Sequence, residues 1–125
     1  MLTDSSVVTI LLVRDAEKAV TFYRDTLGLH HEMTLDGQEI FAVRSGALAL
    51  MPEPDWKPTG RTELSFEVED ITGEITGLEG RGVRFADYDL PDLKTVDHIA
   101  EFGDGQRAAW FEDPDGNVLC LHQNG

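Results

Sequence analysis

The sequence is poor in cysteine, in basic residues and in long apolar runs. Its single cysteine, Cys120, has no partner for an internal disulfide, which is typical of proteins in a reducing compartment. No segment approaches the roughly 20 apolar residues of a membrane-spanning helix. The N-terminus also lacks the basic segment and apolar stretch of a secretory signal. We therefore expect a cytoplasmic protein.

Acidic side chains dominate the charge. The 125 residues include 24 Asp and Glu against 10 Lys and Arg, which gives a formal net charge of -14. Nucleic-acid binding requires a positive patch, and anionic membranes attract basic proteins, so this balance argues against both as partners. It favours a cationic ligand, although solubility, or life in a salty cell interior, is the simpler explanation.

The first half of the chain predicts a strand, a helix and three further strands. SVVTILLV is rich in β-branched residues, and Asp15 then occupies an N-cap position before an amphipathic helix that ends at Gly28. Turn signals follow at 36–37 and 45–46. We expect strands at about 6–13, 29–35, 38–45 and 47–51.

The same order repeats after a proline-rich linker, 53–60. A strictly alternating strand at 62–68 is followed by Asp70 at an N-cap position and by a weaker helix over 71–83. The pattern then predicts a strand near 83–86, an irregular loop over 87–99, and strands at about 106–112 and 117–123, the last two joined by the DPDG turn.

This internal repeat determines the predicted fold. We expect an α+β fold in which two βαβββ modules, about 5–52 and 61–124, form a cup-shaped mixed β-sheet within a single domain, 1–125. The loop 87–99 would then lie near the mouth of the cup.

Three segments resemble a known family. VRDAEKAVTFYRDTLGL, VED after a strand, and FEDPDGNVLCL are similar to segments of the vicinal-oxygen-chelate superfamily, which includes glyoxalase I, fosfomycin-resistance transferases, extradiol dioxygenases and bleomycin-resistance proteins. The region around the loop resembles a glyoxalase/bleomycin-resistance/dioxygenase-like subgroup. The resemblance implies a homodimer that binds a small molecule in its cup.

The resemblance also implies four positions for the ligands of a divalent metal. They are occupied here by Val8, Ala49, Glu63 and Cys120. Valine and alanine cannot ligate, and the hard carboxylate and soft thiol are a mismatched pair. A site made of Glu63, Cys120 and His122 stays open, but residues two apart on a strand rarely reach one ion. We expect no metal and no other cofactor.

Strand alternation gathers the candidate ligand-binding residues. Glu63, Ser65 and Glu67 share one strand face, and Cys120 shares its face with His122. Each candidate also has an ordinary structural explanation: a solvated sheet face for Glu63, a core position for Trp110, or an anchor for the loop in the case of His98. The candidates are Met51, Glu63, Ser65, His98, Trp110, Cys120 and His122.

Three functional hypotheses follow. The first is a metal-free small-molecule-binding protein that sequesters a cationic or aromatic compound, which Trp110 and the acidic balance favour. The second is a metal-dependent lyase, isomerase or dioxygenase, as in the superfamily. The third is a metal-free enzyme that uses Glu63 as a base, with His98 or His122 as the acid.

Overall fold

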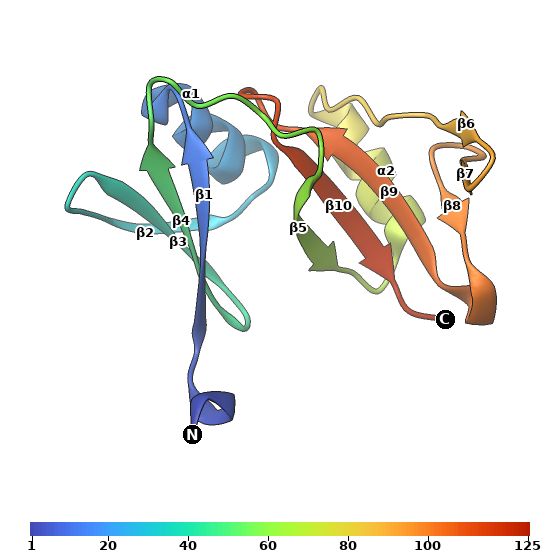
Figure 1. Ribbon diagram of the computed structural model, residues 1–125, viewed down its shortest axis with the longest axis horizontal. Coiled ribbons are helices and arrows are strands. Elements are labelled where there is room, and N and C mark those ends of the chain that lie inside the picture. The colour runs from blue at the N-terminus through green and yellow to red at the C-terminus, as the bar shows by residue number, and fades with distance from the viewer. The chain divides into compact units, whose positions relative to one another are not determined.

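The computed structural model describes residues 1–125, which divide into two compact units, Met1–Lys57 and Pro58–Gly125. Each unit contains one four-stranded mixed sheet with a helix on one face (Figure 1). The predicted α+β fold with two βαβββ-like modules is therefore confirmed. The longest helix has 10 residues, and none is long and apolar enough to cross a membrane.

The sheet of the first unit has the strand order β1-β4-β3-β2, with β1 and β4 parallel and the other pairs antiparallel. A short 3-10 turn, Leu2–Asp4, precedes the sheet. The elements are β1 (Val7–Val13), α1 (Ala16–Thr21), β2 (His30–Leu35), β3 (Gln38–Val43) and β4 (Gly46–Pro52).

Local sequence signals set the limits of the first helix. The Asp15 side chain accepts a hydrogen bond from the Lys18 backbone N–H at 3.2 Å, so this residue caps α1 as predicted. The helix continues as a π-helical segment, Phe22–Thr26, and the chain then turns at Gly28 with a φ of 77°. Glycine suits this left-handed conformation because it has no Cβ.

The second unit repeats this topology, with the order β5-β10-β9-β8. The outer strand β5 runs parallel to β10, as β1 does to β4. The elements are β5 (Thr62–Glu67), α2 (Ile71–Gly80), β6 (Asp89–Leu90), β7 (Leu93–Lys94), β8 (Ala100–Glu101), a 3-10 turn (Gly103–Gly105), β9 (Arg107–Glu112) and β10 (Val118–Gln123).

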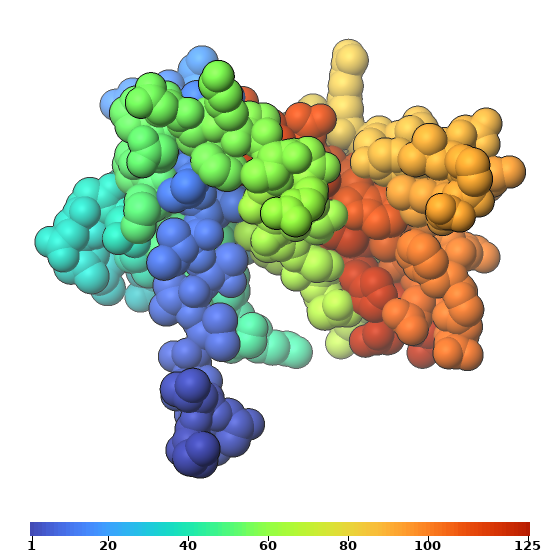
Figure 2. Space-filling model, viewed as in Figure 1, coloured from blue at the N-terminus to red at the C-terminus, as the bar shows by residue number.

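The predicted strand near 83–86 is wrong. Phe85 makes a single bridge to Phe111, and the edge of the sheet is formed instead by β8. Val83 and Phe85 are buried, so their apolar alternation reflects packing in the core rather than strand pairing. The loop 87–99 is also not wholly irregular, because β6 and β7 form a small hairpin, visible as a golden lobe in Figure 2.

Each helix buries one face of its sheet and leaves the other uncovered. In the second unit, Leu119 and Leu121 alternate along β10 with Cys120 and His122, and the two leucines are buried on the α2 side. Burying each such side chain contributes about 1.5–3 kcal/mol. The core of this side also contains Ile71, Ile75, Leu78, Val83, Phe85, Ala109 and Phe111.

The DPDGN turn joins β9 to β10 through one buried carboxylate. Asp113 is 5% exposed, and its two oxygens accept hydrogen bonds from the Asp115 and Asn117 backbone N–H groups and from the Asn117 side-chain amide, each at 2.9 Å. These bonds hold β10 in register with β9, so the turn also fixes which residues of β10 face away from α2.

We predict that Asp113→Ala lowers the free energy of unfolding by about 2–4 kcal/mol, because three buried donors lose their acceptor. Urea unfolding measures the change. The control is Asp92→Ala, an exposed loop carboxylate for which we expect less than about 0.5 kcal/mol. Equal unfolding midpoints for the two variants would contradict this account of the turn.

Candidate functional site

The uncovered face of the second sheet carries most of the predicted site. Cys120 on β10 lies opposite Ser65 on β5 and opposite Trp110 on β9. Residues that face each other across neighbouring strands project on the same side of a sheet. Because α2 covers the other side, Ser65, Cys120 and Trp110 form a row on the side of the sheet turned away from α2, which we call the open face.

A second row of the open face carries a histidine with two fixed partners. His122 lies opposite Glu67 and Ala108. Its Nδ1 is 2.8 Å from Glu67 Oε2, and its Nε2 is 2.9 Å from Gln106 Oε1. With a partner on each side, the imidazole is held in one orientation, and its side chain is 22% exposed. A carboxylate beside a histidine in this way can orient it for proton transfer.

Cys120 is a buried thiol. Its Sγ donates to the Leu121 carbonyl oxygen at 3.3 Å, and the residue is 6% exposed. Burial is the main effect on its pKa and raises it above the ordinary value, while a hydrogen bond with Ser65 acts in the opposite direction. The thiol is therefore protonated at neutral pH, which makes it a poor nucleophile.

Trp110 forms the aromatic part of the open face. Its ring is half-buried and meets the Tyr88 ring edge to face, with centroids 5.6 Å apart. Tyr88 comes from the loop 87–99, so this loop contributes one aromatic wall beside the first row. Glu112, two residues further along β9, adds an exposed carboxylate to the same face.

Glu63 lies at the edge of this arrangement. Its carboxylate accepts a hydrogen bond from the Thr59 hydroxyl at 2.8 Å, and the residue is half-buried. The pairing of β5 with β10 shifts between Val118 and Leu119, so Glu63 has no direct partner on β10. Glu63 therefore borders the row of Ser65 and Cys120 without facing Cys120.

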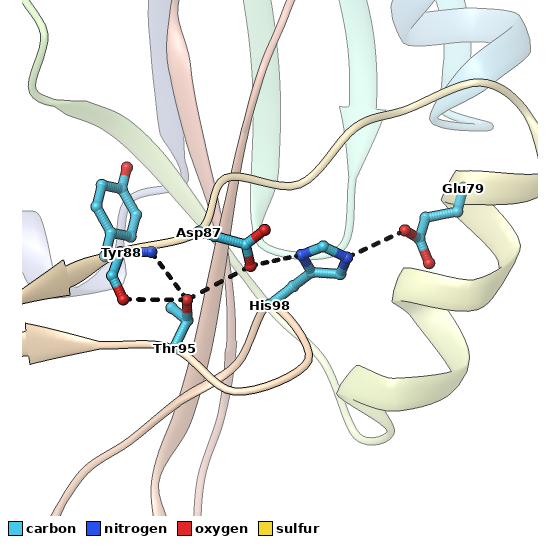
Figure 3. Close-up of polar contacts among 5 residues, drawn as sticks. All are labelled: Glu79, Asp87, Tyr88, Thr95 and His98. Carbon is cyan, nitrogen blue, oxygen red and sulfur yellow. Dashed lines mark hydrogen bonds and ion pairs between the residues drawn. The ribbon is translucent and has the colours of Figure 1, made fainter.

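The structure does not bring His98 to the open face. His98 Nδ1 is 2.8 Å from Asp87 Oδ1, and Nε2 is 3.4 Å from Glu79 Oε2 on α2 (Figure 3). The Tyr88 backbone N–H also donates to the Thr95 hydroxyl at 2.9 Å. The contact with Glu79 ties the loop 87–99 to α2, which is the anchoring role considered from the sequence, while the other two contacts hold the loop together internally.

Met51 belongs to the first unit. It lies opposite Leu12 on β1 and is half-buried on the sheet face turned away from α1. On the same face, Ile10 pairs with Ala49, and Ala49 pairs with Ile40. Met51 therefore has apolar surroundings within its own unit.

The four positions at which the family's metal ligands are expected do not fit a metal. Val8 and Ala49 offer no donor atom, and Ala49 is buried. Glu63 and Cys120 leave only two donors, a hard carboxylate that is hydrogen-bonded to Thr59 and a soft buried thiol. The structure contains no group of three or more His, Cys, Asp or Glu side chains arranged to hold an ion. We derive no chemistry through a metal at these positions.

Gln106 is the member of the open face that sequence reasoning missed. It lies just before β9, and the alternation of the strand expected at 106–112 places it on the face of Trp110, but it is not among the predicted site residues. Only the antiparallel pairing of β9 with β10 brings it to His122, 16 positions further along the chain. No local signal marks such a contact.

We predict that iodoacetamide modifies Cys120 on the order of 100-fold more slowly in the folded protein than in urea, because the thiol is buried and protonated. Mass spectrometry of quenched samples measures both rates. The raised pKa also means that the thiol stabilises the fold below about pH 9, and that this contribution is lost as the pH rises further. Equal rates of iodoacetamide modification in the folded and the urea-unfolded protein would contradict the buried position of Cys120.

Comparison with known proteins agrees with this fold. A model of the Glyoxalase/Bleomycin resistance protein/Dioxygenase superfamily matches residues 6–121, whereas no curated protein matches the sequence. Among solved structures, a member of this superfamily from Sphaerobacter thermophilus is 26% identical, with a TM-score of 0.76, and the match covers 99% of this chain and 100% of that one.

Two further structures show the same fold at lower identity. Lactoylglutathione lyase from Agrobacterium tumefaciens is 20% identical, with a TM-score of 0.72 and coverage of 96% and 93%. A genomically encoded fosfomycin resistance protein from Listeria monocytogenes is 15% identical, with a TM-score of 0.71 and coverage of 95% and 92%. The family model spans nearly the whole sequence, and the chain therefore belongs to the glyoxalase/bleomycin resistance/dioxygenase superfamily.

Proposed function

We propose that the chain is a metal-free small-molecule-binding protein of the glyoxalase/bleomycin-resistance type, which sequesters a cationic or aromatic compound on its open face. The observation that carries the proposal is the row of Ser65, Cys120 and Trp110. Trp110 contributes an aromatic ring, Cys120 a small apolar side chain and Ser65 a hydroxyl, on a sheet face that no helix covers. Such a mixture of apolar surface and few polar groups is typical of ligand sites.

The charge around this row favours a cationic ligand. Glu63, Glu67 and Glu112 are the carboxylates of the open face. A cation over the face of a tryptophan gains about 0.5–2 kcal/mol, and the surrounding carboxylates add to the attraction. The net charge of -14 raises the local concentration of cations around the whole protein.

The oligomer and the location belong to the same proposal. On the uncovered face of the first sheet, Val8 and Ile10 are more than half exposed, and Met33 is 49% exposed. Exposed apolar groups on one face are typical of interaction surfaces, which supports a homodimer. Within each copy, we propose that the two units act as one domain. The free thiol of Cys120 supports a cytoplasmic location.

A second candidate is a metal-free lyase, isomerase or similar enzyme of the superfamily. The contact of 2.8 Å between His122 and Glu67 favours it, because a carboxylate-oriented imidazole can act as a general base. For this candidate, His122 is a better-placed base than Glu63, because the Glu63 carboxylate already accepts a hydrogen bond from Thr59. Turnover of a bound compound that depends on His122 would favour this candidate over binding alone.

We predict that crystal violet, a cationic aromatic dye, quenches the fluorescence of Trp110 and binds more tightly than an anionic dye of similar size. The protein has two tryptophans, so the titration is made in Trp56→Phe, where Trp110 is the only reporter. Calorimetry of Trp110→Ala then measures the loss of the ring, which we expect to weaken binding about 3- to 30-fold.

The matched control is calorimetry of Trp56→Ala, which removes a tryptophan of the first unit and should leave the affinity within about twofold. Equal losses in Trp110→Ala and Trp56→Ala would contradict the proposed position of the ligand. Equal affinity for the cationic and anionic dyes would contradict the proposed class of ligand.

A further inference from the structure

A groove of about 750 Å³ lies on the helix side of the second unit, between α2 and the segment 94–101. Arg107 forms part of its lining. Arg107 alternates along β9 with Ala108, which lies opposite His122 on the open face. The groove is therefore on the opposite side of the sheet from Cys120. Its volume is in the range of small-molecule sites.

The guanidinium of Arg107 is only loosely paired, by an ion pair with Glu101 in which no hydrogen bond is made. Its Nε is buried without a hydrogen bond, and this atom is 3.8 Å from Glu101 Oε1. Nη2 is 3.5 Å from the Thr72 hydroxyl, which is at the upper limit for a hydrogen bond. Guanidinium groups bind carboxylates through two parallel N–H bonds, and none is present here. This end of the groove is suited to a carboxylate supplied from outside.

The corresponding groove of the first unit differs in this respect. It lies between α1 and β3, has a volume of about 390 Å³, and is lined by Arg24 and Glu39 among others. Arg24 makes two hydrogen bonds to the Asp25 carboxylate, at 2.8 and 3.0 Å. The arginine of the smaller groove thus has a carboxylate at hydrogen-bond distance, while that of the larger groove has only the more distant carboxylate of Glu101.

The other end of the large groove is acidic. Thr72, Thr76 and Glu79 follow one another along one side of α2, so Glu79 lies roughly 10 Å along the helix from Thr72. The Glu79 carboxylate faces the His98 ring in Figure 3, and Asp97 also lines this groove. Between the two ends, Ile75 and Ile99 provide apolar lining.

We propose that this groove binds a short peptide with free termini. The peptide carboxylate lies at Arg107 and the Thr72 hydroxyl, its middle side chain lies over the isoleucines, and its ammonium group lies towards Glu79. An extended chain of three residues spans roughly 10 Å, which matches the distance between the two ends. A simple anion is repelled by the net charge of -14, whereas a zwitterion is not.

The test is an NMR titration of the ¹⁵N-labelled full chain with the tripeptide Ala-Leu-Ala. We expect shifts of amide signals in α2 and in the segment 94–101, and saturation in the millimolar range or below. The C-terminal amide of the same peptide should bind at least about tenfold more weakly, because the bond to the guanidinium is lost. The N-acetylated peptide, which lacks the ammonium group, should bind at least about threefold more weakly than the free peptide.

Three protein variants complete the test. Arg107→Gln should weaken binding at least about tenfold, while Lys94→Gln, a matched loss of charge within the same groove, should weaken it less than about threefold. Glu101→Gln should strengthen binding, since it removes the carboxylate nearest to Arg107. The amide spectrum of each variant reports whether it is folded, and the peptide amide tests the same bond without any mutation.

The proposal is overturned if the peptide produces no shifts at 10 mM. It is also overturned if the shifts lie on β5 and β10 instead of α2, or if the free and amidated peptides bind equally. If Arg107→Gln and Lys94→Gln weakened binding equally, the peptide would respond only to the overall charge of the groove. That result would also reject the proposed contact between Arg107 and the peptide carboxylate.

Discussion

Packing of a helix against one side of each sheet decides which side chains are left on the other side. Along β10, Leu119 and Leu121 pack beneath α2, so Cys120 and His122 must face the other way. Because side chains alternate along a strand, a shift of one residue would exchange these two sets and place the histidine in the core. The carboxylate of Asp113 holds the register at the turn before β10. The residues of the open face are therefore selected by packing under α2 and by the turn before β10.

The two units use the same topology for different surfaces. In the first sheet, the row that runs from Ile10 through Ala49 to Met33 is wholly apolar. In the second sheet, the comparable rows contain a hydroxyl, a thiol, an indole and the paired His122 and Glu67. Since one fold can support many functions, this chemical difference between the repeats, rather than family membership, supports the proposal that a ligand binds on the open face.

The sequence predicts those features that depend on neighbours along the chain. The cap at Asp15, the DPDGN turn and the two faces of β10 all follow from local patterns, and the structure shows each of them. The strand expected near Phe85 fails because burial under a helix produces the same apolar spacing as strand pairing. The partner of His122 at Gln106 arises from the pairing of two strands, which no local pattern contains.

We propose above all that this chain binds a small molecule without a metal. Val8 and Ala49 provide no donor, so only two of the four positions at which the family's ligands are expected could contact an ion, and catalytic sites usually need about three protein ligands. The most direct measurement is the metal content of untagged protein, purified without chelator, by elemental mass spectrometry. The account predicts far less than one metal ion per chain, with none taken up on titration. Zinc, iron, manganese or nickel at close to one ion per chain would contradict it.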